Sequence, residues 1–147
     1  ICPMCQTVST ETAGPRQILQ TEGFLAFCPW APSHPYEFWI YPKKHMTSFS
    51  KITQKEINDL SLILRATLGG LAATMKNPSY NMVFHLSPEK KNNRQIHWHV
   101  EVYPQSEAWS GLERGFGVFL NKITPEKAAE ELGASCRKEL AGLVGIV

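Results

Sequence analysis

Two histidines and a glutamate occupy alternate positions in the stretch QIHWHVEVYP, residues 95–104. Strict alternation of polar and apolar residues predicts a half-buried β-strand, with His97, His99 and Glu101 on one face. The opposite, core-facing side is expected to carry Ile96, Trp98, Val100 and Val102. Imidazole is a good metal ligand and a good nucleophile toward phosphorus. The pattern therefore favours a chemical role for this strand face over an exposed or core-satisfied pair of histidines.

A Cys-x-x-Cys pair, Cys2 and Cys5, opens the chain. In the absence of a secretion signal, such a pair is more typical of a metal or redox site than of a disulfide. A structural zinc ion takes four nitrogen or sulfur ligands. The candidates for the other two ligands are His34, His45, His85, His97 and His99. A thioredoxin-like site is disfavoured because no helical pattern follows Cys5. Cys28 and Cys136 lie among apolar residues and are expected in the core.

Alternating and helical hydrophobic patterns together predict an α+β fold, an antiparallel sheet packed against one long helix. We expect a single domain over residues 1–147. Its predicted strands cover 17–32 (one or two strands), 35–45, 79–88, 95–104 and 111–121, with a loop up to Arg16, a charged turn at 89–94 and a terminal helix over 125–132. That last helix has Thr124 as its cap, Pro125 at its first position and Gly133 beyond its end.

The long helix is marked at both ends. Thr53 and Glu56 have the spacing of a capping box, and Pro78 stops the helix. Its predicted buried stripe consists of Ile57, Leu60, Leu64, Leu68, Leu71 and Met75.

Composition excludes several classes of protein. The formal charge of +2 is too small to indicate nucleic acid or an anionic membrane as the partner. The longest apolar stretch, residues 60–75, is interrupted by Ser61, Arg65 and a glycine pair, so no transmembrane helix is predicted. No signal peptide is visible. We expect a cytoplasmic protein. Because the chain starts at Ile1 rather than Met, we also expect it to be a piece of a longer protein.

Several segments together resemble one known family. The strand HWHVEVYP resembles the central strand of the histidine-triad superfamily, and CPMC and YPKKH match two landmarks of its zinc-bearing members. More narrowly, the chain resembles the C-terminal half of galactose-1-phosphate uridylyltransferase-like proteins, including the plant ADP-glucose phosphorylase type. The matching segments are PKKHMTSF, YNMVFHLSP, HWHVEVYP and GLERGFGVFLNKITPEKAAEEL, in this order and over nearly the whole chain.

The resemblance implies a role for each residue of the triad strand. It implies a zinc ion held by Cys2, Cys5, His45 and His97. His99 falls at the middle triad position, where active members carry the nucleophile that is transiently nucleotidylated. Glu101 stands where active members carry His or Gln, and its negative charge disfavours an incoming phosphate. In this family the nucleophile belongs to the N-terminal half, so we expect His99, the only catalytic candidate of this chain, not to be the nucleophile.

Residues 110–121 correspond to the family segment that contacts the nucleotide sugar, often across a dimer interface. The substrate-binding residues implied by this resemblance are Gly111, Glu113, Arg114, Gly115, Gly117 and Asn121. Glycines permit close backbone approach, and Arg114 and Lys122 could neutralise phosphate. On residues alone, the segment reads equally well as a glycine-containing edge strand. His85 and His34 are expected to be ordinary polar residues.

Three functions remain open at this stage. In the first, the chain is the C-terminal domain of a dimeric nucleotidyltransferase that acts on a nucleotide sugar and a hexose 1-phosphate, with the nucleophile on the N-terminal half. In the second, it is a stand-alone histidine-triad hydrolase or transferase using His99. In the third, it is a non-catalytic, zinc-stabilised nucleotide-binding module.

Overall fold

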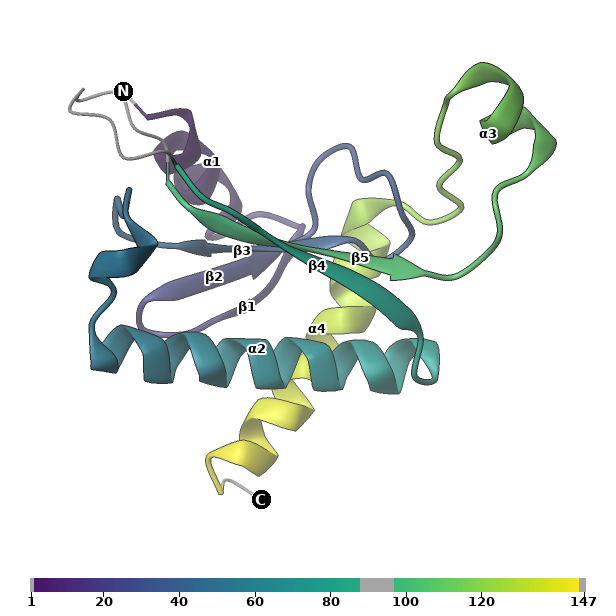
Figure 1. Ribbon diagram of the computed structural model, residues 1–147. Helices are drawn as coiled ribbons and strands as arrows, with labels where there is room; N and C mark the ends of the chain where they lie inside the picture. Colours follow the sequence, from purple (N-terminus) through teal and green to yellow (C-terminus); the bar gives the residue numbers. More distant parts are fainter. Residues whose placement is uncertain (1, 88–96, 146–147) are drawn as a thin grey trace.

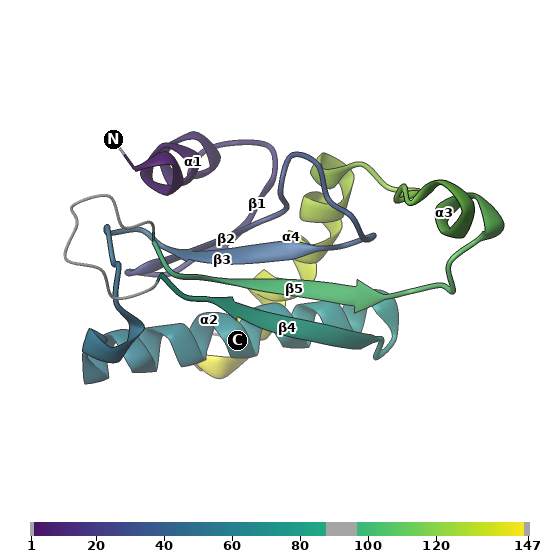
Figure 2. The same cartoon turned by 45° about the horizontal axis from the view of Figure 1, so that its top comes forward.

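A five-stranded antiparallel sheet, in the order β1-β2-β3-β5-β4, forms the centre of the computed structural model, which describes residues 2–87 and 97–145. Helices α2 and α4 cover one face of the sheet, and α1 lies on the other (Figures 1 and 2). The α+β class is therefore confirmed. The strands are β1 (Gln17–Gln20), β2 (Phe24–Phe27), β3 (Phe38–Pro42), β4 (Ser79–His85) and β5 (His99–Gln105); the helices are α1 (Pro3–Glu11), η1 (Phe49–Lys51), α2 (Gln54–Met75), α3 (Gly111–Phe116) and α4 (Pro125–Leu143).

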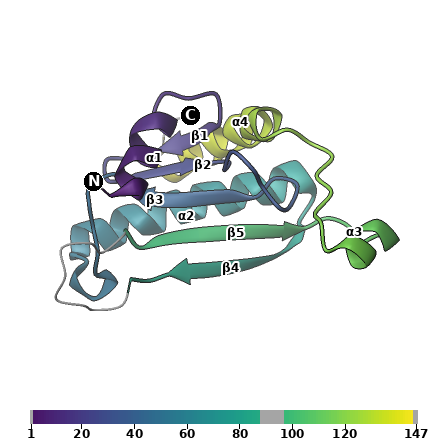
Figure 3. The same cartoon turned by 90° about the horizontal axis from the view of Figure 1, so that it is seen from above.

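Strand β5 lies between β3 and β4 and has two unlike faces (Figure 3). Trp98, Val100 and Val102 are fully buried in the main core with residues of α2 and α4, as their alternation predicts. His99 and Glu101 point to the opposite face, and His99 pairs with His85 on β4. Ile96 and the charged turn at 89–94 lie outside the described residues. The central strand therefore combines the core and the candidate site.

Helix α2 begins as predicted. The Thr53 side chain accepts a hydrogen bond from the Glu56 backbone N–H, and the Glu56 carboxylate accepts one from the Thr53 backbone N–H, which completes the capping box. One predicted core residue is wrong, because Ile57 is 40% exposed. The buried face runs through Leu60, Ile63, Thr67 and Leu71. Ile57 lies at the edge of this face, given about 100° of rotation per residue.

Helix α4 packs closely against α2 and is longer than predicted. It continues past Gly133 to Leu143, so Gly133 does not end it. This glycine is buried, and a Cβ on it would lie 3.2 Å from the Ile18 carbonyl oxygen of β1 and 2.9 Å from the Arg137 guanidinium. Close approach to the sheet, rather than termination, explains the glycine. Cys28 and Cys136 are buried core residues, as expected.

Residues predicted as a loop near the N-terminus form helix α1. Cys2 is its N-cap residue and Pro3 occupies the first helical turn, where a missing backbone N–H costs nothing. A small second core lies on the sheet face away from α2 and consists of Val8 of α1 with Leu25, Phe27 and Tyr41 of the sheet. Met4 of α1 packs against it. Tertiary packing stabilises this short helix, which the local sequence pattern does not announce.

The predicted strand at 111–121 is also wrong. Residues Gly111–Phe116 form helix α3, capped by the Ser110 and Glu113 capping box and ended by Gly117 at φ 65°. This segment projects away from the sheet (Figures 1 and 3). Its apolar side chains remain exposed: Trp109, Leu112, Phe116, Val118, Phe119 and Leu120. We call residues 105–122 the arm. Among the described helices, none is long and apolar enough to cross a membrane.

We expect Gly70→Ala to lower the free energy of unfolding. A Cβ at Gly70 would lie 2.4 Å from Cys136 Sγ and 2.8 Å from the Cys136 backbone nitrogen, so α2 and α4 would have to separate. Overpacking of this kind costs about 1–3 kcal/mol, measurable by urea unfolding. Gly142→Ala is the matched control, because no atom lies within 4 Å of its added Cβ. Equal stability of the two variants would contradict the close helix crossing.

Candidate functional site

The first cluster of functional side chains joins the N-terminal helix to the start of β5. Cys2 caps the start of α1 and Cys5 lies in its first turn, His45 follows β3, and His97 precedes β5. Their donor atoms all lie within 4.8 Å of one another. Cys5 Sγ is 3.4 Å from His45 Nδ1 and 3.4 Å from His97 Nε2. We call these four residues the knuckle cluster.

These distances fit a tetrahedral metal site. Zn–S bonds of about 2.3 Å and Zn–N bonds of about 2.0–2.1 Å at a tetrahedral angle place sulfur and nitrogen about 3.6 Å apart. Two thiolates and two imidazoles form a donor set typical of structural zinc. The structure thus brings together the four residues that the resemblance implies: Cys2 and Cys5 with two of the five histidines of the sequence, His45 and His97.

The electrostatics of the knuckle cluster also fit a cation. Burial raises the pKa of the Cys2 thiol, but hydrogen bonds from the backbone N–H groups of Cys5, His97 and Met4 outweigh it and lower the pKa overall. Burial and the neighbouring Cys2 raise the pKa of Cys5. A bound divalent cation would remove this mutual repulsion, because both thiolates bind it. Burial, His45 and His99 lower the pKa of His97 to about 4, which keeps its imidazole neutral and able to bind metal.

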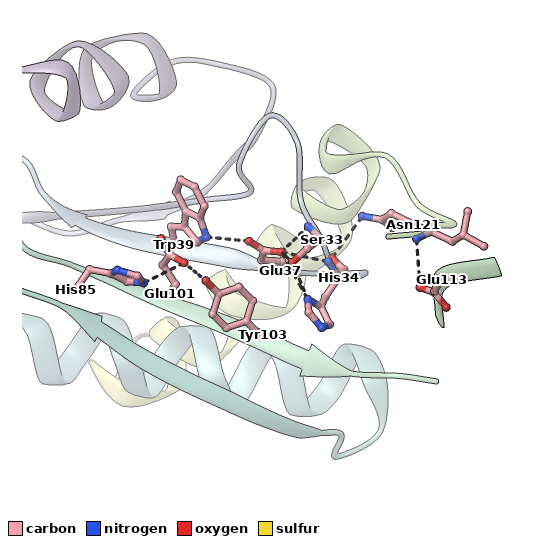
Figure 4. Close-up of polar contacts among 10 residues, drawn as sticks. Ser33, His34, Glu37, Trp39, His85, Glu101, Tyr103, Glu113 and Asn121 are labelled. Atoms are coloured by element: carbon pink, nitrogen blue, oxygen red, sulfur yellow. Dashed lines mark hydrogen bonds and ion pairs between the residues drawn. The ribbon is translucent and has the colours of Figure 1, made fainter. Parts of the chain in front are cut away.

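The second cluster lies beside the first on the same face of the sheet and centres on Glu101. Its Oε1 lies 2.8 Å from His99 Nε2, and its Oε2 lies 3.3 Å from His85 Nε2. The Tyr103 hydroxyl donates a further hydrogen bond to Oε2 (Figure 4). His99 and Glu101 are buried, whereas 46% of the His85 side chain is exposed. We call His85, His99 and Glu101 the triad cluster.

Aromatic stacking fixes the triad cluster in place. The His99 ring lies between two others, 4.4 Å from Tyr41 and 4.8 Å from His85 between ring centres, with both pairs within about 5° of parallel. Trp39 packs against His99 at 6.0 Å. The donor atoms of the triad cluster also lie within 4.8 Å of one another, so it too can hold a cation. Sequence reasoning missed this role of His85, whose pairing with His99 depends on the β4–β5 register.

The predicted substrate-binding residues do not converge on the triad cluster. A Cβ added to Gly111 or Gly115 would meet no atom within 4 Å, so neither glycine lies against the body of the protein. Arg114 Nε donates to the Trp109 carbonyl at 3.4 Å. Glu113 accepts from the backbone N–H groups of Ser110 and Leu120 and so holds the arm in shape.

Asn121 does reach the body of the protein. Its Nδ2 donates to the His34 carbonyl oxygen at 3.4 Å, which links the end of the arm to the loop between β2 and β3 (Figure 4). A cavity of about 100 Å³ lies at this junction, lined by His34 and Glu113 among others. A wider groove of about 510 Å³ lies between α1 and the tryptophans Trp30 and Trp39.

The comparisons with known proteins agree with the fold and the order of the segments. No family model matches the chain. ADP-glucose phosphorylase of Arabidopsis thaliana is 30% identical over 132 residues, which cover 88% of this chain and 36% of that protein. Galactose-1-phosphate uridylyltransferase of Thermotoga maritima is 29% identical over 140 residues, 89% of this chain and 44% of that protein. The chain thus spans less than half the length of these two relatives.

A third relative has a length similar to this chain. An uncharacterized HIT-like protein of Mycoplasma genitalium is 30% identical over 132 residues, which cover 88% of this chain and 87% of that protein. The match spans nearly all of both chains. It therefore shows that the whole chain is a HIT-like domain.

Solved structures agree. A uridylyltransferase structure superposes with a TM-score of 0.83 at 29% identity, over 93% of this chain and 45% of that one. The Arabidopsis thaliana ADP-glucose phosphorylase solved with bound ADP-glucose gives a TM-score of 0.79 at 29% identity, over 90% and 42% of the two chains. A zinc-bound histidine triad protein from Mycobacterium smegmatis shares the fold, with a TM-score of 0.65 at 18% identity over 99% and 97%. The chain belongs to the family of histidine-triad (HIT)-like proteins, and over most of its length it is similar to part of galactose-1-phosphate uridylyltransferase and of ADP-glucose phosphorylase.

Proposed function

We propose that the chain is the C-terminal domain of a nucleotidyltransferase that acts on a nucleotide sugar and a hexose 1-phosphate, in the manner of UDP-glucose:galactose-1-phosphate uridylyltransferase. ADP-glucose phosphorylase and galactose-1-phosphate uridylyltransferase, each more than twice as long as the region that matches this chain, support this proposal. The N-terminal half of the same protein would carry the nucleophilic histidine. This domain would supply a zinc site, contacts to substrate and contacts to a second copy in a homodimer.

The state of His99 is the observation that carries the proposal. A histidine that attacks phosphorus must offer a ring nitrogen with a free lone pair. Nε2 of His99 is bonded to the Glu101 carboxylate, and Nδ1 is buried. With the proton on Nε2, the lone pair lies on Nδ1, which a phosphate cannot reach. Glu101 also places a negative charge where an anionic phosphate would approach. The covalent step therefore falls to a histidine outside this chain.

The expected reaction has two half-steps. A histidine of the N-terminal half attacks the α-phosphorus of the nucleotide sugar, and hexose 1-phosphate leaves as the P–O bond breaks. An oxygen of a second hexose 1-phosphate then attacks the phosphorus of the nucleotidyl-histidine. The P–N bond breaks, which regenerates the free histidine and releases a new nucleotide sugar. The arm is the part of this chain suited to substrate contact, because its exposed aromatic residues Trp109 and Phe119 stand beside a cavity.

One observation favours a second candidate function. The Mycoplasma genitalium relative is covered over 87% of its length, so chains of about this size exist without an additional half. A stand-alone histidine-triad hydrolase or transferase would use His99 as its nucleophile. It would have to break the hydrogen bond between His99 and Glu101 before each turnover.

The knuckle cluster is the proposed zinc site. Cys2, Cys5, His45 and His97 would supply all four ligands, which leaves no open position for a substrate. The metal would therefore stabilise the fold by joining α1 to the start of β5. No step of the reaction passes through it.

We expect purified protein to contain one zinc ion per chain, and Cys5→Ser to lose most of it. Because the binding energy of a structural metal is folding energy, this variant should also lose roughly several kcal/mol of stability. Metal analysis and thermal unfolding measure the two effects. Cys28→Ala is the matched control: it removes a buried thiol outside the knuckle cluster and should keep the metal. Undiminished zinc in Cys5→Ser would refute the assignment.

The metal-free protein should lose stability in mild acid through His97. Its folded-state pKa of about 4 lies below the ordinary histidine value of about 6.5, so the unfolded chain binds more protons between these values. The contribution of His97 to the free energy of unfolding is therefore complete above about pH 6.5 and falls as the pH drops toward 4. Urea unfolding of the chelated protein across this range measures it. His97→Gln, which cannot titrate, should show a shallower pH dependence; identical slopes would contradict the buried neutral state.

We expect no covalent adduct when the protein is incubated with UDP-glucose or ADP-glucose labelled in the α-phosphate. The protein should nevertheless bind one of the two nucleotide sugars, because the arm remains available. An acid-labile adduct that disappears in His99→Ala would replace this proposal with the stand-alone enzyme. Neither adduct nor binding would leave a zinc-stabilised structural module.

A further inference from the structure

A buried carboxylate organises the loop between β2 and β3. Glu37 is 3% exposed, and both of its oxygens are occupied. Oε2 accepts hydrogen bonds from Ser33 N at 2.7 Å, Ser33 Oγ at 2.7 Å and His34 N at 3.1 Å. Oε1 accepts from Trp39 Nε1 at 3.0 Å. Figure 4 shows Ser33, His34 and Glu37 gathered between Glu101 and Asn121. The carboxylate thus fixes the positions of both Ser33 and the His34 backbone.

The backbone of this loop is held in an uncommon conformation. Tyr36 has φ 61°, in the left-handed region that residues other than glycine seldom adopt. Its hydroxyl donates to Glu131 Oε2 on α4 at 2.6 Å, which ties the turn to the helix layer. The turn brings Glu37 back onto Ser33. A left-handed backbone conformation costs a residue such as tyrosine free energy, so it persists only where surrounding contacts enforce it.

The hydrogen bonds select one tautomer of His34. Ser33 Oγ lies 2.7 Å from His34 Nδ1 and 2.7 Å from Glu37 Oε2. A hydroxyl has one proton to donate, and the carboxylate can only accept. The serine proton therefore goes to Glu37, and His34 must donate its Nδ1 proton to the serine oxygen. In the neutral imidazole this leaves the lone pair on Nε2.

The His34 ring is packed at the edge of the cavity beside the arm. It lies 5.5 Å from the Tyr103 ring and 5.8 Å from the Phe119 ring, between ring centres. Since Nδ1 is turned to Ser33, Nε2 is the remaining polar atom of the ring, and no described residue forms a hydrogen bond with it. Tyr103, which packs against the His34 ring, also donates a hydrogen bond to Glu101 and so connects His34 to the triad cluster.

The cavity offers hydrogen-bond acceptors and little positive charge. Glu107, Glu113 and Lys122 line it, so two carboxylates stand against one ammonium group. Lys122 is already paired with Glu107 at 2.6 Å. A phosphate group would meet net negative charge here, whereas a group rich in O–H donors would find partners. The lining therefore favours sugar hydroxyls over phosphoryl oxygens.

We propose that His34 is a sugar-binding residue: its Nε2 accepts a hydrogen bond from a hydroxyl of the nucleotide sugar in the cavity between the 33–35 loop and the arm, with the tautomer set by Ser33 and Glu37. This inference rests on the proposed function and extends it to the specificity for the sugar. Glu37 acts through Ser33 and His34 and is a positioning residue.

Binding measurements separate the sugar from the nucleotide. UDP-glucose, UDP, ADP-glucose and ADP are titrated by calorimetry against the full chain, His34→Phe and Ser33→Ala. His34→Phe keeps a ring against Tyr103 and Phe119 but removes both nitrogens. We expect each variant to bind the preferred nucleotide sugar about five- to tenfold more weakly, the worth of about one hydrogen bond, with affinity for the sugar-free nucleotide unchanged. Ser61→Ala, an exposed serine on α2, is the control and should bind as wild type.

The outcomes are distinguishable. A wild-type protein that binds no nucleotide sugar overturns the proposed function and this inference with it. If the wild type binds a nucleotide sugar but the variants lose no affinity, the inference alone is overturned. The same holds if the variants lose equal affinity for sugar-bearing and sugar-free nucleotides. Nitrogen-15 spectra of the histidines give a second, ligand-free test: His34 should carry its proton on Nδ1 in wild type and lose this preference in Ser33→Ala. A proton on Nε2 in wild type would refute the tautomer and the acceptor role.

Discussion

The two-faced character of β5 is the constraint on which the rest of the structure depends. Trp98, Val100 and Val102 close the core on one side, while His99 and Glu101 face the other. Because side chains alternate strictly along a strand, a slip of one residue would bury the histidines in the core and expose the tryptophan. The hydrophobic effect on one face therefore fixes the placement of imidazoles on the other. The side chains of the candidate site are thus positioned by core residues that do not belong to the site.

Much of the fold could be predicted because its signals are local. The Thr53–Glu56 capping box and the alternation along β5 each depend on a few consecutive residues, and both are borne out. Helix α1 could not be predicted, since it has only nine residues and depends for its stability on the packing of Met4 and Val8 against the sheet. In the arm, the Ser110–Glu113 capping box is a local helix signal that the strand prediction at 111–121 did not use.

The candidate site divides in the same way. The residues of the knuckle cluster were named from the resemblance, and the structure brings their donor atoms within 4.8 Å of one another. The pairing of His85 with His99 needed the register of β4 against β5. The hydrogen bonds among Ser33, His34 and Glu37 could not be predicted from the sequence. They require a left-handed backbone conformation at Tyr36, and tyrosine seldom adopts one. Side-chain chemistry can be read from residue types; the hydrogen-bond partner of each side chain cannot.

The knuckle cluster also bears on the order in which the molecule assembles. Its members come from three distant stretches, and the pairs Cys5–His45 and Cys5–His97 are separated by 40 and 92 residues. Bringing such distant groups together costs loop-closure entropy that rises only slowly with length, so the longer loop is hardly more costly than the shorter once the strands have paired. A complete set of four ligands therefore exists only after β3 and β5 lie side by side. The proposed zinc would therefore bind late in folding and would act as a reversible cross-link on a sheet that has already formed.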